Sequence, residues 1–213
     1  MDFLPADINA YAEAHTSPET DVLSQLSRNT RAHVMAPRML SGHLQGRFLS
    51  MIAHMIRPRR ILEIGTYTGY SALCLAEGLT DDGRLITIDH NEELESFARS
   101  YWQRSPLANQ IELRIGSAAD VIPALDETFD LVFIDADKRN NALYYDLVFD
   151  KLRPGGIILA DNVLWSGKVV NPVKPADQDT AAVLAFNQKI QDDPRVENVL
   201  LPLRDGIMMI RKF

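Results

Sequence analysis

The chain of 213 residues contains one cysteine, Cys74, so it cannot form an internal disulfide. A chain without disulfides is typical of a reducing compartment. Cys74 falls in a segment with a helical pattern, where we interpret it as a small buried residue rather than a nucleophile.

Long hydrophobic runs are also missing. No run approaches the roughly 18 apolar residues that a membrane span needs, so we expect no membrane partner. The opening segment MDFLPADINAYAEAH has no basic region followed by an apolar run, and we expect no signal peptide.

Excess positive charge is absent too, because the formal net charge is −7. This disfavours nucleic acid as the main partner, since phosphate binding favours a basic surface. With 46% hydrophobic and 24% charged residues, the composition predicts a soluble, cytoplasmic globular protein.

From residue 59 onward, short apolar runs alternate with helical patterns. The expected strands are 59–65, 85–89, 111–116, 129–137 and 157–162, and the expected helices are 68–79, 91–105, 118–125, 140–152 and 179–193. This alternation predicts a doubly wound α/β domain whose parallel sheet is covered on both faces. The segment RPGG (153–156) is expected to break the chain before the fifth strand, and a long loop is expected at 163–178.

The two ends of the chain differ from this middle part. The apolar runs 196–203 and 206–213 are separated by Arg204 and Asp205, with Asp205 and Gly206 as the turn signal. This spacing predicts a hairpin and therefore an antiparallel last strand. Residues 1–58 are expected to form a helical addition to the α/β core of 59–213, and the whole chain to form one domain.

Polar residues follow four of the expected strands. Glu63–Gly65, Asp89, Asp135–Lys138 and Asp161–Asn162 all fall at carboxyl ends of parallel strands. Ligands of doubly wound sheets bind in the crevice beyond these ends. The sequence therefore predicts a polar ligand site there.

The loop after the first expected strand, EIGTYTGYS, indicates a nucleoside site. Gly65 and Gly69 permit close backbone approach, and Asp89 ends the next strand, where an acid accepts hydrogen bonds from ribose hydroxyls. The glycine spacing departs from G-x-G-x-x-G, and Glu63 would place a carboxylate beside a pyrophosphate. Both features favour S-adenosylmethionine, which carries cationic groups, over a nicotinamide dinucleotide. The alternative for Glu63 is a carboxylate that only braces the loop.

A second set of residues indicates a metal site. Asp135 and Asp161 end neighbouring expected strands and Asn162 follows, which provides the hard oxygen ligands that Mg²⁺ or Mn²⁺ accepts. Three such ligands leave positions for two adjacent oxygens of an aromatic diol such as a catechol. Lys138 could then take the proton of the reacting hydroxyl. The alternative is that Lys138 only forms a surface ion pair with Asp135 and Asp137.

Several segments together resemble a known family. ILEIGTYTGYSALCLA, LITIDHN, FDLVFIDADK, LRPGGIILADNVLWSGKV and LPLRDGIMMIRK are similar to segments of the cation-dependent O-methyltransferases of the caffeoyl-CoA and catechol type. The resemblance runs from about Thr16 to Phe213. It implies the seven-stranded, Rossmann-like methyltransferase sheet, usually in a homodimer, with S-adenosylmethionine and Mg²⁺, or Mn²⁺ or Ca²⁺ in its place.

The resemblance also implies roles for individual residues. Asp135, Asp161 and Asn162 would be metal ligands and Lys138 the catalytic base. The residues that would contact S-adenosylmethionine are Ser41, Glu63, Gly65, Thr66, Ser71, Asp89, Ala118 and Asp137. Ser166 stands where plant caffeoyl-CoA enzymes have a substrate-binding asparagine, which disfavours a coenzyme A thioester as the substrate.

The function that we predict is methyl transfer to one hydroxyl of a small vicinal-dihydroxy aromatic. Two alternatives belong to other classes: an NAD-dependent oxidoreductase and a non-catalytic nucleoside-binding module. The complete set of Asp135, Lys138, Asp161 and Asn162 favours the enzyme over the module.

Overall fold

The computed structural model describes residues 4–213, and its centre is one seven-stranded sheet. The strands are β1 Arg60–Ile64, β2 Arg84–Asp89, β3 Ile111–Ile115, β4 Phe129–Ile134, β5 Leu152–Asp161, β6 Val196–Leu201 and β7 Ile207–Lys212. Their order in the sheet is β3-β2-β1-β4-β5-β7-β6. The first five strands are parallel, whereas β7 runs antiparallel to both β5 and β6. The predicted doubly wound sheet with a terminal hairpin is confirmed.

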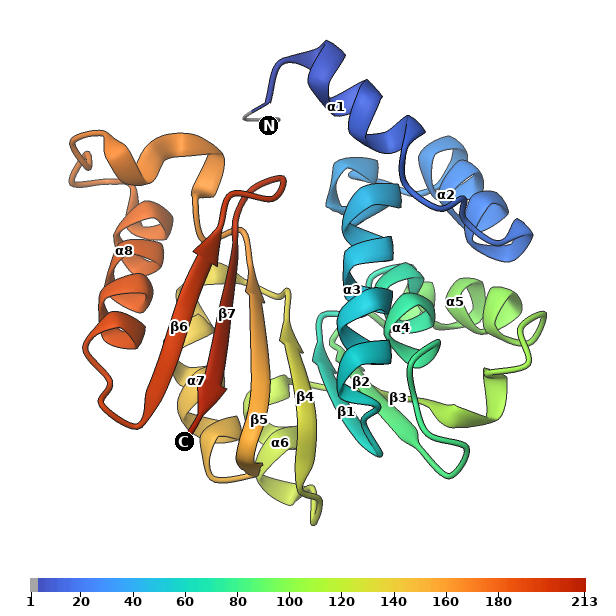
Figure 1. The fold of residues 1–213 in the computed structure, drawn as a ribbon. Coiled ribbons are helices and arrows are strands. Elements are labelled where there is room, and N and C mark those ends of the chain that lie inside the picture. The colour runs from blue at the N-terminus through green and yellow to red at the C-terminus, as the bar shows by residue number, and fades with distance from the viewer. Residues whose placement is uncertain (1–3) are drawn as a thin grey trace.

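Helices cover the sheet on both faces. They are α1 Ala6–Ala14, α2 Asp21–His33, α3 Gly42–Ile56, α4 Tyr70–Ala76, α5 Glu95–Trp102, α6 Ala118–Ala124, α7 Asn141–Phe149 and α8 Gln178–Gln191. Five short 3₁₀ helices are η1 Pro37–Met39, η2 Glu92–Leu94, η3 Ala108–Gln110, η4 Lys138–Asn140 and η5 Trp165–Val170. Figure 1 shows α3, α4 and α5 on one face and α6, α7 and α8 on the other, with the predicted helical addition at the N-terminal end. Within residues 4–213, no helix has the length and apolar character that crossing a membrane requires.

The alternation of side chains along each strand separates two hydrophobic cores. On β1, Leu62 and Ile64 belong to the core beneath α6, α7 and α8, while Ile61 belongs to the core beneath α2 to α5. Because successive side chains of a strand point to opposite faces, Glu63 shares the face of Ile61. The sequence thus places one carboxylate inside the second core, where it is fully buried.

The structure corrects three boundaries that we expected from the sequence. RPGG does not precede β5 but lies inside it. Phe129 of β4 pairs with Leu152 of β5, whereas Leu131, two residues further on, pairs with Ile157, so the register of the two strands shifts between these pairs. The extra residues form a bulge, which Gly155 permits with its φ of 72°. Strand β4 ends at Ile134 and not at residue 137, and the expected loop 163–178 contains η5.

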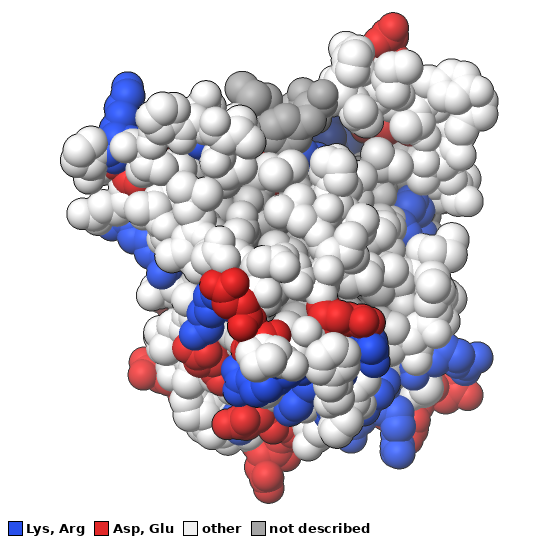
Figure 2. Space-filling model, turned by 60° about the vertical axis from the view of Figure 1, so that its left-hand side comes forward, with Lys and Arg blue, Asp and Glu red and all other residues white. Residues whose placement is uncertain are grey.

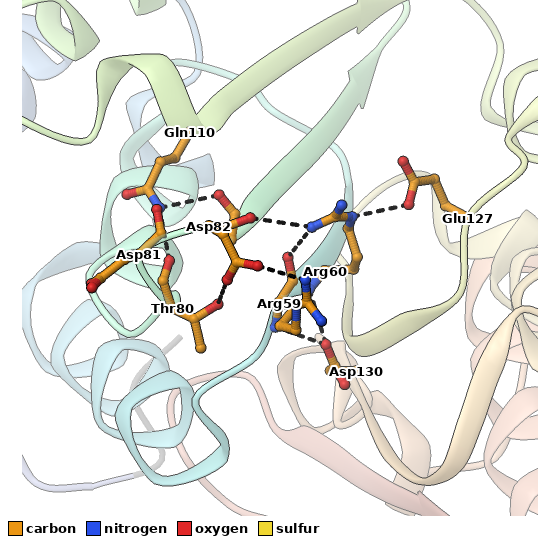
Figure 3. A network of polar contacts seen from close by, with 9 residues as sticks. Arg59, Arg60, Thr80, Asp81, Asp82, Gln110, Glu127 and Asp130 are labelled. Carbon is orange, nitrogen blue, oxygen red and sulfur yellow. Dashed lines mark hydrogen bonds and ion pairs between the residues drawn. The ribbon is translucent and has the colours of Figure 1, made fainter.

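Polar contacts at the amino ends of the strands form a network that is unrelated to the predicted site (Figure 3). One carboxylate oxygen of Asp130 accepts hydrogen bonds from the backbone N–H groups of Arg59 and Arg60, at 2.8 and 2.9 Å. The Gln110 amide donates to carbonyl oxygens of the turn at 80–83. These contacts hold the starts of β1 and β4 and the turn before β2.

Candidate active site

The loops after β1 and β4 pack directly against each other at the carboxyl ends of the strands. Gly65 has φ +99°, and a Cβ atom there would overlap the carbonyl oxygen of Asp135. The backbone N–H of Asp135 donates to the carbonyl oxygen of Ile64 at 2.8 Å. Only glycine satisfies both the dihedral angle and the close approach, so Gly65 brings the two predicted ligand loops together.

Glu63 is the buried carboxylate of this region. It is fully buried, and it pairs in register with Thr87, whose hydroxyl donates to Glu63 Oε2 at 2.5 Å. Burial raises the pKa of Glu63 to about 8; the charges of Asp135 and Asp89 add to this effect, while the hydroxyls of Ser71 and Thr87 oppose it. In the described part of the chain, Glu63 Oε1 has no hydrogen-bond partner. A buried carboxylate oxygen without a donor fits a cationic ligand group.

Asp89 braces the loop after β1. Its Oδ2 accepts the backbone N–H groups of Thr66 and Tyr67 at 3.0 and 2.8 Å, and its Oδ1 accepts that of Asn91 at 2.9 Å. A carboxylate has about four acceptor sites, so these bonds leave room for about one more donor. Asp89 therefore holds the nucleoside loop in shape and keeps capacity for a ligand hydroxyl.

Lys138 and Asp135 form an ion pair that is mostly shielded from solvent. Lys138 Nζ lies 3.0 Å from Asp135 Oδ1, and the two side chains are 8% and 22% exposed. Asp137 takes no part, because it accepts hydrogen bonds from Asn140 and Tyr144 instead. The ion pair of our alternative interpretation is thus real, but it is not a surface pair with both carboxylates.

Asp161 is the second strand-end carboxylate and is 3% exposed. Its Oδ2 accepts a hydrogen bond from Gln45 Nε2 at 2.6 Å, and its Oδ1 accepts the backbone N–H of Asn162 at 2.7 Å. Burial raises the pKa of Asp161, the charge of Asp135 raises it further, and Lys138 opposes both. Two carboxylates that repel each other in a buried site favour a bound cation.

Asn162, the third predicted metal ligand, has an unusual backbone conformation. Its φ is 61°, in the left-handed region, and the backbone N–H of Trp165 donates to its carbonyl oxygen at 3.3 Å. Such strain is concentrated at functional sites. Among residues 4–213, no group of three or more His, Cys, Asp or Glu side chains is arranged to hold a metal ion. The predicted metal site therefore depends on the Asn162 amide, and its three oxygen donors fit a hard divalent cation.

The other predicted residues belong to several different elements. Ser71 is buried in the first turn of α4, Ser41 is buried just before α3, and Ala118 begins α6. Asp137 is exposed and occupied by its contacts with η4 and α7. The hydrogen bonds and charges described above link Glu63, Asp135, Lys138 and Asp161, whereas no such contact joins Ala118 or Asp137 to them in the described structure.

Our sequence interpretation missed Gln45 and Arg204. Gln45 lies on α3 and contacts Asp161 although 116 residues separate them, and Arg204 contacts Gln45 from the β6–β7 turn. Gln45 gave no signal beyond its place directly before Gly46. Arg204 gave no signal beyond its place in the turn.

The fold and the strand-end residues together define a class of protein. A doubly wound sheet with an acidic, glycine-containing loop after β1 and an acid at the end of β2 is a nucleoside-binding α/β domain. The buried carboxylate of Asp161 and the partly buried ion pair of Asp135 with Lys138 add a candidate reaction centre to that domain.

Comparison with known proteins identifies the family. The family model described as O-methyltransferase matches residues 13–213. Probable caffeoyl-CoA O-methyltransferase 2 of Dictyostelium discoideum is 34% identical over 207 residues, covering 95% of this chain and 90% of that protein. Mouse catechol O-methyltransferase domain-containing protein 1 is 36% identical over 176 residues, covering 79% of this chain and 66% of that protein. The SAH-bound methyltransferase PaMTH1 of Podospora anserina superposes with a TM-score of 0.90 at 30% identity, covering 100% of this chain and 99% of that chain.

The chain belongs to the O-methyltransferase family, in its caffeoyl-CoA O-methyltransferase type. The resemblance that we stated from the sequence is confirmed, and so is the class that it implied, an S-adenosylmethionine-dependent O-methyltransferase. Membership in this family excludes our alternative prediction of an NAD-dependent oxidoreductase.

Proposed function

We propose that this protein transfers the methyl group of S-adenosylmethionine to one hydroxyl of a small vicinal-dihydroxy aromatic that is chelated to a divalent metal. The observation that carries the proposal is the group formed by the buried residues Lys138 and Asp161 and the partly buried Asp135 at the carboxyl ends of β4 and β5. It lies in a chain of the O-methyltransferase family, next to a loop that suits an S-adenosyl ligand.

The donor side of the site is built by the loop after β1. The unpartnered oxygen of Glu63 would pair with a cationic group of S-adenosylmethionine, since burial makes an ionised Glu63 costly without such a partner. The remaining acceptor capacity of Asp89 suits a ribose hydroxyl. Ser41, Gly65, Thr66, Ser71, Ala118 and Asp137 are proposed as the other donor contacts.

The metal side would be held by Asp135, Asp161 and Asn162. A bound Mg²⁺, or Mn²⁺ or Ca²⁺, would orient two adjacent acceptor oxygens and lower the pKa of the reacting hydroxyl. Lys138 would take the proton of that hydroxyl at Nζ. The acceptor oxygen then forms a bond to the methyl carbon while the carbon–sulfur bond breaks, and the electron pair of that bond stays on sulfur. The buried position of Lys138 keeps it beside Asp135 and away from solvent.

Exposed apolar side chains support an aromatic acceptor. They come from the segment around η1 and from the loop between β5 and α8, namely Met35, Met39, Val170 and Val173. In the same loop, Lys168 is paired with Asp177, which reduces the positive charge that the loop offers to the phosphates of a coenzyme A thioester. The indole N–H of Trp165 is buried without a partner in the described part of the chain and would suit an acceptor oxygen.

Methyl transfer to a panel of catechols and matched monophenols, with Mg²⁺ and with EDTA, tests the proposal. We expect methylation of catechols alone, abolished by EDTA. Equal methylation of monophenols, or full activity in EDTA, would overturn the chelation. Binding of S-adenosylmethionine without turnover of any catechol would favour the non-catalytic module.

A homodimer is also part of the proposal. On the face that carries α3, Figure 1 shows no helix in front of β5, β7 and β6. Met51 and Met55 on α3 are 62% and 75% exposed, and Val199 on β6 is 47% exposed. On the face shown in Figure 2, charged side chains gather toward the lower end and a broad area above them is largely uncharged. Analytical ultracentrifugation of the protein and of Met55→Asp tests this assembly: we expect a dimer that the substitution weakens, and a monomer at every concentration would refute it.

A further inference from the structure

We propose that Gln45 and Arg204 are a positioning pair for Asp161: Arg204 fixes the orientation of the Gln45 amide, and the amide fixes the orientation of the Asp161 carboxylate. The inference rests on the proposed function, because it concerns the same metal site. Neither residue is a ligand or a base in this proposal.

The contacts run from the β6–β7 turn through α3 to the end of β5. Gln45 is fully buried in the first turns of α3, and its Nε2 lies 2.6 Å from Asp161 Oδ2. Gln45 Oε1 accepts a hydrogen bond from Arg204 Nη1 at 3.2 Å. The same nitrogen donates to the carbonyl oxygens of Leu40, at 2.9 Å, and Ser41. Figure 1 shows the β6–β7 hairpin beside the strand that ends at Asp161, at the same end of the molecule as the start of α3.

The chemistry of the three groups allows only one orientation of the amide. An arginine side chain has hydrogen-bond donors but no acceptor, and an ionised carboxylate has only acceptors. The amide oxygen of Gln45 must therefore face Arg204, and its NH₂ group must face Asp161. A rotation by 180° would place oxygen against carboxylate and NH₂ against guanidinium, so both hydrogen bonds would become repulsive contacts. Arg204 thus ensures that Asp161 faces the NH₂ group of Gln45, which is a hydrogen-bond donor, and not its amide oxygen.

The consequence for Asp161 is a fixed carboxylate plane. One oxygen accepts the backbone N–H of Asn162 and the other accepts the Gln45 amide, so two different elements each hold one oxygen. Each oxygen keeps a further acceptor position for a cation. Partners that orient a metal ligand in this way typically change metal affinity or activity about 10–100-fold when they are removed.

A purely structural role of Arg204 would make a different prediction. Its bonds to the Leu40 and Ser41 carbonyls could simply tie the hairpin, where Arg204 has φ 50°, to the start of α3. That role does not involve Gln45 or Asp161. Loss of it would lower thermal stability and leave metal affinity unchanged.

Mn²⁺ affinity of the metal-free protein, measured by titration calorimetry, separates the two roles. Gln45→Met keeps the volume of the side chain and removes both hydrogen bonds, so we expect the Mn²⁺ Kd to rise about 10–100-fold. The Kd of S-adenosylmethionine should not change. Arg204→Met should weaken Mn²⁺ binding less, and Arg204→Lys, which retains a donor, should restore part of the loss. In the Gln45→Met background, Arg204→Met should have no further effect on Mn²⁺ binding, because the two residues act through one contact.

Gln110→Met is the matched control. Gln110 is a partly buried glutamine whose amide also donates hydrogen bonds, but it donates them to backbone carbonyl oxygens at the amino ends of the strands (Figure 3). We expect this variant to lose thermal stability and to keep the Mn²⁺ Kd of the unmodified protein.

Two results would overturn the positioning role alone. These are an unchanged Mn²⁺ Kd in folded Gln45→Met, or, if that variant does not fold, an unchanged Kd in Arg204→Met. Absence of Mn²⁺ binding in the unmodified protein, together with catechol methylation that EDTA does not affect, would overturn the proposed metal site itself and the positioning role with it.

Discussion

Replacing Glu63 by glutamine should remove the pH dependence of S-adenosylmethionine binding between pH 6 and 8. Glu63 has a pKa of about 8 against an ordinary value of 4.5, mainly because it is fully buried. In the ligand-free protein it is therefore mostly neutral at pH 7. A cationic donor favours the ionised form, so binding of the donor must release the Glu63 proton below pH 8.

The size of the effect follows from the ionised fraction. With a pKa of about 8, about 1% of Glu63 is ionised at pH 6 and about half at pH 8, so donor affinity should rise about 50-fold over this interval. Titration calorimetry across this pH range measures the change, and repeating it in buffers of different ionisation enthalpy measures the released proton. The side-chain amide of the Glu63→Gln variant cannot ionise, so the donor affinity of this variant should be weaker and nearly constant.

The same pKa predicts how the stability of the ligand-free protein depends on pH. Because the pKa in the folded state is raised, Glu63 stabilises the fold fully below about pH 4.5, and this contribution is lost as the pH rises through about 8. Glu63→Gln should reduce this loss in thermal denaturation. A donor affinity that does not vary between pH 6 and 8 in the unmodified protein would refute the assignment of Glu63 as the partner of the cationic donor.

Three further predictions concern other residues of the site. Asp161→Ala should abolish metal-dependent turnover while S-adenosylmethionine still binds, as steady-state kinetics and calorimetry would show. Lys138→Met should lower kcat about 10²–10⁴-fold with little change in donor affinity, because it removes the proposed base. Gly65→Ala should lower the melting temperature and abolish donor binding, because its Cβ would overlap the backbone of Asp135. Gly42→Ala is the matched control, since Gly42 also has positive φ but has no atom within 4 Å of an added Cβ, and it should cost only about 1–2 kcal/mol.

Each of these predictions has a result that would contradict it. Full metal-dependent turnover in the Asp161→Ala variant would show that Asp161 is not a metal ligand. An unchanged kcat in the Lys138→Met variant would show that Lys138 is not the base and only forms the ion pair with Asp135. Equal losses of stability in Gly65→Ala and Gly42→Ala would show that backbone strain alone, and not the close approach of the two loops, makes glycine necessary.

The sequence by itself determined the elements of the sheet and the positions of the polar strand ends. Short apolar runs and the turn at Asp205 and Gly206 are local signals, and the local pairing of β6 with β7 follows from them. Glu63, Asp135 and Asp161 could be selected because parallel strands bring their carboxyl ends to one edge, whatever the details of packing. The residues at which β4 ends and β5 begins could not be predicted from the sequence, because the bulge at RPGG depends on how β5 pairs with β4.

Only the tertiary structure decided what surrounds these residues. The raised pKa of Glu63 comes from burial beneath α3 to α5, and burial is a property of packing and not of local sequence. The contacts of Gln45 with Asp161 and of Arg204 with Gln45 join residues that are 116 and 159 positions apart. No periodicity or motif spacing encodes such a contact, because it exists only after α3 and the β6–β7 hairpin have packed at the same end of the sheet.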